Sequence, residues 1–205
     1  MNDTRFQASD LEPSDDDRSA ARRALADRIA ATVAVVAAGV WVGGMVALGA
    51  CAAPFVFQLT PAPFSGDAMG AAFARFDQVA LGAAVVLLGA EVTRTWAAGA
   101  RGTRVAARAR RLVAILMAAG AALGGLSLTP QINALHRGGA QRGVGPQGEE
   151  LNRIHKTAEA VGKAETGLGV LLIALHVFTL ATPRPEDDDL APAGPYRRHQ
   201  DHHGA

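Results

Sequence analysis

Long uncharged stretches alternate with short charged ones along the chain. The uncharged runs cover residues 29–66, 78–90, 112–135 and 166–183. About 20 apolar residues in a helix cross the hydrocarbon core of a bilayer. The pattern therefore predicts four transmembrane helices, at about 29–59, 77–98, 112–135 and 157–182. We expect an all-α, integral membrane four-helix bundle that forms one domain over residues 21–182.

Proline and charge divide this pattern into its parts. Pro54 lacks an amide donor, so we expect it to kink or end the first span. Residues 64–77 have helix-like apolar spacing and predict an interfacial segment that leads into the second span. Residues 136–156 are polar and glycine-rich, which predicts a loop.

The second span reaches two charged residues after only 13 uncharged ones. Glu91 and Arg94 are three residues apart, so they share a helix face and are expected to pair. Their long stems can also reach toward an interface.

Charge is concentrated in the two tails. Residues 1–28 and 183–205 hold 20 of the 39 charged side chains, although the whole chain of 205 residues is only 19% charged. Residues 1–20 and 183–205 are therefore predicted to be disordered.

Composition argues against several classes of function. A net charge of +1 and 5% aromatic residues do not favour nucleic-acid binding. The single cysteine, Cys51, excludes an intrachain disulfide and a cysteine zinc site. It follows Leu48 in a short sequence that resembles a lipoprotein cleavage box, but the apolar run continues past it, which favours a helix interior. No catalytic motif or phosphate loop is found, so we expect a protein that is not an enzyme.

Lysine and arginine counts predict the orientation in the membrane. The N-terminal tail, the segment 94–111 and the C-terminal tail share one side and hold 14 of the 20 basic residues. Because basic residues concentrate on the cytoplasmic side, both termini are expected in the cytoplasm of an inner-membrane protein.

Four polar residues are predicted at the outer mouth of spans three and four. Asn133 and His136 share one helix face, and Asn152 and His155 share another. If the two spans are antiparallel, these pairs converge and could bind a metal or a small polar ligand. The alternative, which we favour, is that they are interfacial side chains that hydrogen-bond helix ends.

His176 lies inside the fourth span. An ionisable residue at such a position is a functional hypothesis by default, and Glu91 is its expected partner. His155 is 21 residues away, or about 32 Å along a helix, so the two histidines cannot share a metal. The alternative is a neutral, hydrogen-bonded histidine.

Two pairs of glycines have a spacing that permits close helix packing. Gly39 and Gly43 lie in the first span, and Gly120 and Gly124 lie in the third. They allow a homo-oligomer or packing within one bundle, and we favour the second.

Several short motifs follow one another in order along the chain. The first span begins with Trp41, Gly43 and Gly44 and ends with Pro54 and Phe57; Pro130 and Asn133 end the third span, and His155 opens the fourth. This order resembles the transmembrane protein 205-like family over residues 29–182. The resemblance implies a four-helix domain of the bacterial cytoplasmic membrane, without an established reaction, substrate or cofactor. Lys156, Thr157 and Ala158 depart from the small residues and serine common in that family.

Three functional hypotheses remain open. The first is a non-enzymatic membrane protein without a cofactor, whose role the sequence does not specify. The second is a copper- or haem-binding bundle with His136, His155 or His176 as ligands, because the first span also resembles copper-resistance and haem-pathway membrane proteins. The third is a small transporter or channel lined by Glu91, Arg94 and His176, which requires these side chains to face the bundle interior.

Overall fold

The computed structural model describes residues 14–61, 64–99 and 105–180, and these are helical apart from short turns. The first rod consists of α1 (Asp15–Val46), a π-helical turn η2 (Ala47–Ala52) and α2 (Ala53–Leu59). The second is α3 (Phe64–Ala98). The third consists of α4 (Val105–Leu123), a π-helical turn η4 (Gly124–Leu128) and α5 (Thr129–Arg137), and the fourth is α6 (Gly145–Leu180).

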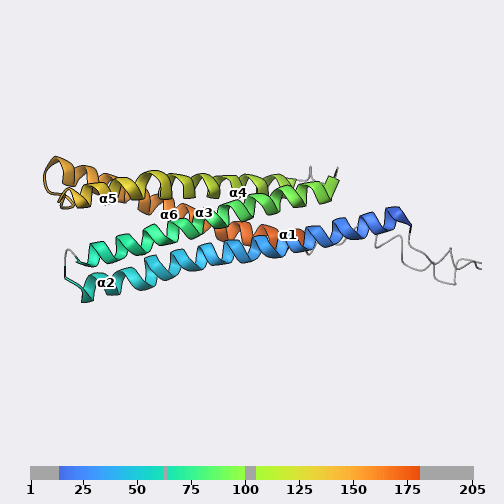
Figure 1. Ribbon diagram of the computed structural model, residues 1–205, viewed down its shortest axis with the longest axis horizontal. Coiled ribbons are helices and arrows are strands. Elements are labelled where there is room, and N and C mark those ends of the chain that lie inside the picture. Colours follow the sequence, from blue (N-terminus) through green and yellow to red (C-terminus); the bar gives the residue numbers. More distant parts are fainter. Residues whose placement is uncertain (1–13, 62–63, 100–104, 181–205) are drawn as a thin grey trace, which may run out of the picture.

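The four rods form an up-and-down bundle (Figure 1). α1 packs on α3 and α6, and α4 packs on the same two helices. α1 and α4 are therefore diagonal to each other. The ends of α2 and α5 lie at one end of the bundle, and the end of α3 and the start of α4 lie at the other (Figure 1).

Small side chains line the inner face of α1. Ala30, Ala34 and Ala38 recur every four residues and are buried, and Trp41 continues this face into the core. Alanine at these positions lets neighbouring helices approach closely. The other three helices contribute larger core residues such as Leu87, Met117 and Leu172.

The outer surface of the bundle is apolar as well. Val85 is 72% exposed, and Ile115 and Phe178 are each more than half exposed. All four rods are long and apolar enough to cross a membrane. A water-soluble protein would not expose so much apolar surface. The structure confirms the expected fold class, an all-α, multi-pass membrane bundle.

Two prolines are accommodated by π-helical turns. Pro54 and Pro130 each lie in the first turn of a helix, α2 and α5, and η2 and η4 come directly before these helices. The amides of Ala53 and Thr129 donate to carbonyls five residues back. A wider turn relieves the clash between the proline ring and the preceding turn. Pro54 therefore does not end the first rod, which continues to Leu59.

Two expected boundaries were wrong, and a third segment joins its neighbour without a break. The first helix begins at Asp15, inside the segment predicted to be disordered, because Ser14 and Asp17 form a capping box. α3 is one helix from Phe64, so the segment predicted to be interfacial is helical and continuous with the second span. α6 begins at Gly145 rather than after residue 156, so the expected loop shrinks to a few residues. Its polar first turns hold exposed pairs such as Glu150–Arg153. Residues 1–13 and 181–205 lie outside the described residues.

Candidate functional site: a buried ion network

All four rods contribute to a polar network inside the bundle. The start of α1, the end of α3, the start of α4 and the end of α6 meet at the same end of the molecule (Figure 1). The network consists of Asp27, Glu91, Arg94, Arg110, His176 and Thr179.

Arg94 joins three helices. Its Nε donates to Asp27 Oδ1 at 2.9 Å on α1, and its Nη1 donates to His176 Nδ1 at 2.7 Å on α6. Its Nη2 reaches Thr179 Oγ1 at 3.5 Å. Because a guanidinium can only donate, His176 Nδ1 is an acceptor and the neutral ring carries its proton on Nε2.

Arg110 joins α4 to the same network. Its Nε donates to Glu91 Oε1 at 2.6 Å, and its Nη1 donates to Thr179 Oγ1 at 3.2 Å. His176 Nε2 lies 3.3 Å from the same Glu91 oxygen. The angle of this approach does not make a hydrogen bond, so His176 Nε2 has no hydrogen-bond partner among the described residues.

The network is buried and its charges balance. Glu91 and Arg94 are each 4% exposed, Arg110 is 5% exposed and His176 is fully buried. Two guanidinium groups face two carboxylates, and Asp27 is the member closest to solvent. Glu91 Oε2 is also buried without a hydrogen-bond partner in the described part of the chain. The network therefore has unused hydrogen-bonding capacity at one carboxylate oxygen and one imidazole nitrogen.

The sequence identified part of this network. Glu91 does come close to His176, but the expected pairing of Glu91 with Arg94 was wrong, because Arg94 turns to Asp27 and Glu91 turns to Arg110. The sequence pattern places Asp27 and Arg110 in the segments that flank the spans, and it gives no signal for Thr179. Asp27 and Arg110 come just before an uncharged run, and Glu91 and Arg94 come just after one. Because neighbouring spans are antiparallel, these positions fall at one end of the bundle, and comparing them would have indicated the network.

A second group of polar side chains lies further along the bundle axis from the network, and we call it the second level. Thr129 Oγ1 donates to Asp77 Oδ2 at 2.6 Å. Glu165 is 8% exposed, and its Oε1 is buried without a hydrogen-bond partner among the described residues. Asp77 lies close enough to Glu165 to repel its carboxylate. Asp77 is 14 residues from Glu91 on α3, which is about 21 Å along the helix.

The two histidines at the opposite end of the bundle do converge. His136 Nε2 and His155 Nε2 are 3.4 Å apart, and their rings meet edge to face. Asn152 Oδ1 accepts from Arg142, and Asn133 lies beside Gly70. Within the described residues, no group of three or more metal-ligating His, Cys, Asp or Glu side chains comes together.

The remaining motif residues have structural positions. Trp41 is buried in the core, and Phe57 is exposed on α2. Gly44 faces the ring of Phe76, and Gly120 faces the carboxylate of Glu165.

At three of the four predicted packing glycines, an added Cβ atom would meet no other atom within 4 Å. They are Gly39, Gly43 and Gly124. The favoured interpretation, packing within the bundle, therefore holds for Gly120 alone.

Four antiparallel apolar helices around an interior ion network define a small multi-pass membrane protein. Residues 36–141 match a domain of unknown function, DUF4149, which covers more than half of the chain. The chain belongs to the DUF4149 family. The match extends from the middle of α1 through α5 and includes Glu91, Arg94 and Arg110. No curated protein and no solved structure matched the chain.

Proposed function

We propose that this protein is a non-enzymatic protein of the cytoplasmic membrane, of the transmembrane protein 205-like type, and that it conducts protons through the interior of its bundle. Both termini are proposed to lie in the cytoplasm, so the ion network forms the cytoplasmic end of the path.

One observation carries this proposal: ionisable side chains lie inside the bundle at two depths. Glu91, Arg94 and His176 face the interior rather than lipid, as a transport role requires. Asp77 and Glu165 form the second level, and both levels have polar atoms without a hydrogen-bond partner in the described chain. Ionisable residues within membrane spans are costly and commonly mark proton relays.

Proton flux into vesicles tests the proposal. The purified protein is reconstituted into vesicles that contain a pH-sensitive dye, and a potassium gradient with valinomycin drives proton entry. We expect faster acidification than in protein-free vesicles, and a loss of at least half of that excess in Glu165→Gln and in Glu91→Gln.

Glu159→Gln is the matched control, because Glu159 is an exposed carboxylate on the same helix as Glu165. It should conduct like the native protein. If native protein and empty vesicles acidify at the same rate, the bundle does not conduct protons and the proposal fails.

A second candidate function is metal binding at His136 and His155. Tetrahedral zinc with Zn–N bonds of 2.0–2.1 Å sets its two nitrogens about 3.4 Å apart. The observed distance between the two Nε2 atoms is 3.4 Å. The remaining ligands would be water or Asn133. His176 does not fit the copper or haem hypothesis equally well, because its two ring nitrogens face Arg94 and Glu91.

Zinc titration distinguishes this candidate. The test uses the full chain with His199, His202 and His203 replaced by alanine, so that tail histidines cannot contribute. We expect one equivalent of Zn²⁺ to bind and to raise the unfolding temperature, and His136→Ala or His155→Ala to abolish both effects. Binding that is unchanged in both variants would exclude this pair as the ligands.

A further inference from the structure

Two cavities follow one another between α1 and α3, from the ion-network end into the apolar part of the bundle, and together they outline a groove. Its outer section is a cavity of about 490 Å³, lined by Asp15, Arg18, Ser19, Arg22, Arg23 and Trp96. Its inner section is a cavity of about 360 Å³, lined mainly by Ile29, Ala30, Val33, Val86 and Ala90. Both sections follow the same helix faces, because their residues recur every three or four positions on α1 and on α3.

The outer section is basic. It contains three arginines and one aspartate, and that aspartate, Asp15, pairs with Arg18. Arg22 and Arg23 have no carboxylate partner among the described residues. Guanidinium groups bind phosphate oxygens with a matching fork of donors. Two arginines without a carboxylate partner in the described part of the chain, at the end of an apolar groove, favour a ligand with a phosphate group.

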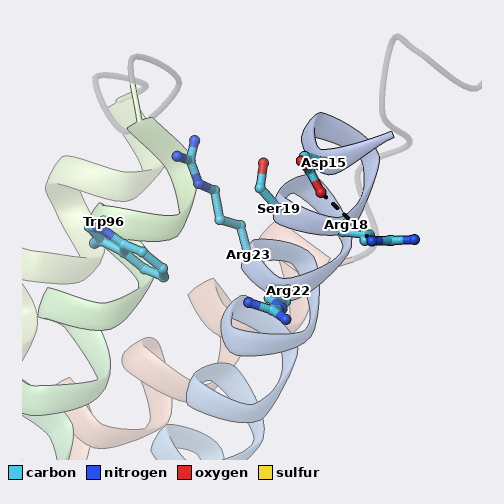
Figure 2. Close-up of a pocket in the computed structure, with 6 residues that line it drawn as sticks. All are labelled: Asp15, Arg18, Ser19, Arg22, Arg23 and Trp96. Atoms are coloured by element: carbon cyan, nitrogen blue, oxygen red, sulfur yellow. Dashed lines mark ion pairs between the residues drawn. The ribbon is translucent and has the colours of Figure 1, made fainter. Parts of the chain in front are cut away.

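Trp96 fixes the depth of this section. Figure 2 shows its ring on α3 facing Arg23 across the gap to α1, and the guanidinium carbon lies 5.9 Å from the ring centroid. Trp96 is 62% exposed. Tryptophan at such a position is typical of the boundary between headgroups and acyl chains. Arg23 therefore lies level with Trp96, and Arg22 is its neighbour on α1 in the same lining.

The inner section has the character of an acyl-chain site. It extends from Ala26 and Thr93 to Val33 and Val86, seven residues along each helix, or about 10 Å. Ile29 and Val33 remain exposed along it, and no charged residue lines it. An elongated ligand with a phosphate at one end and a hydrocarbon chain at the other would contact both sections.

We propose that this groove is a binding site for one anionic phospholipid, with its phosphate on Arg22 and Arg23, its glycerol region against Trp96, and one acyl chain between α1 and α3. The site is separate from the proposed proton path, because the groove opens on the outer surface of the bundle whereas the network lies inside.

Fluorescence quenching by brominated lipids tests the site in the full-length protein. Trp41 is fully buried, so Trp96 is the tryptophan that lipid can reach. In mixed vesicles, we expect brominated phosphatidylglycerol to quench Trp96 at least twofold more strongly than brominated phosphatidylcholine. This preference should disappear in the Arg22→Gln/Arg23→Gln double variant. A Trp96→Phe variant supplies the background from Trp41.

Arg28→Gln is the matched control. Arg28 is a basic residue of the same helix that does not line either section of the groove, so its loss should leave the preference unchanged. Equal quenching by the two lipids in the native protein would overturn the proposal, as would a preference that survives in the double variant. Loss of the preference on adding millimolar inorganic phosphate would indicate a site for soluble anions instead.

Discussion

At the scale of single residues, the central feature is the cost of ions inside the bundle. Arg110 and Glu91 are both about 5% exposed, and their side chains meet at 2.6 Å. A buried ion pair contributes little net stability, but the loss of one partner leaves the other charge uncompensated. The network is therefore sensitive to any change that removes a single charge.

We predict that Glu91→Gln lowers the free energy of unfolding by about 3 kcal/mol, because Arg110 would lose its ionic partner in the interior. The measurement is unfolding by SDS in mixed micelles. Glu159→Gln is the matched control: it breaks a pair of similar length, 2.7 Å, that is exposed to solvent. Equal stability of the two variants would contradict the burial of Glu91.

The glycines of the first span should differ in their tolerance of a methyl group. A Cβ at Gly44 would overlap the ring of Phe76, whereas a Cβ at Gly39 would meet open space. We predict that Gly44→Ala destabilises the bundle by about 1–3 kcal/mol through overpacking. Gly39→Ala should preserve or raise stability, because alanine favours helix.

The same unfolding assay compares these two variants. If Gly39→Ala destabilises the protein as much as Gly44→Ala, Gly39 has a contact outside the bundle. A change in the oligomeric state of Gly39→Ala would identify that contact as a second copy of the chain.

At the scale of helices, the sequence predicted the number and character of the spans but not their ends. Uncharged runs locate the parts of each helix that must avoid water. They say nothing about polar turns beyond them, so α6 begins 12 residues before the predicted span. Ser14 and Asp17 illustrate the reason: the start of α1 depends on a local capping box rather than on hydropathy.

The ion network was only partly predictable because pairing depends on packing between helices. Their spacing of three residues places Glu91 and Arg94 on one helix face and predicts that they pair with each other. In the bundle, Arg94 finds Asp27, which is 67 residues away in the chain. Only the order of helices around the bundle selects this partner over the nearer one.

The lipid-facing surface of α3 provides a test at this scale. Val85 is 72% exposed in the middle of an uncharged run, and Val105 is 82% exposed at the start of α4. We predict that Val85→Lys impairs membrane insertion, because a lysine near the bilayer centre costs about 3 kcal/mol. Val105→Lys should insert normally, since it adds a charge beside an arginine-rich segment.

Insertion is measured as the fraction of protein that resists extraction with alkaline carbonate. Normal insertion of Val85→Lys would mean that this face of α3 is not in contact with lipid chains.

At the scale of the whole molecule, the two ends of the bundle differ in chemistry. One end contains the interior network, the arginines of the groove and the start of α4, and the other contains the histidine pair. The proposed proton path would run from the buried network at one end to the second level of carboxylates, Asp77 and Glu165, nearer the other. The proposed lipid groove lies at the same end as the network, and its outer section holds three arginines.

The most direct test of this account is the sidedness of the two ends. Val144, in the turn before α6, and Gly102, in the segment between α3 and α4, are replaced singly by cysteine in a Cys51→Ala background. A membrane-impermeant maleimide is then applied to intact cells. Val144→Cys should react at once, and Gly102→Cys should react only after the membrane is permeabilised. Labelling of both sites from one side would contradict the four-span bundle, and labelling in the reverse order would contradict its orientation.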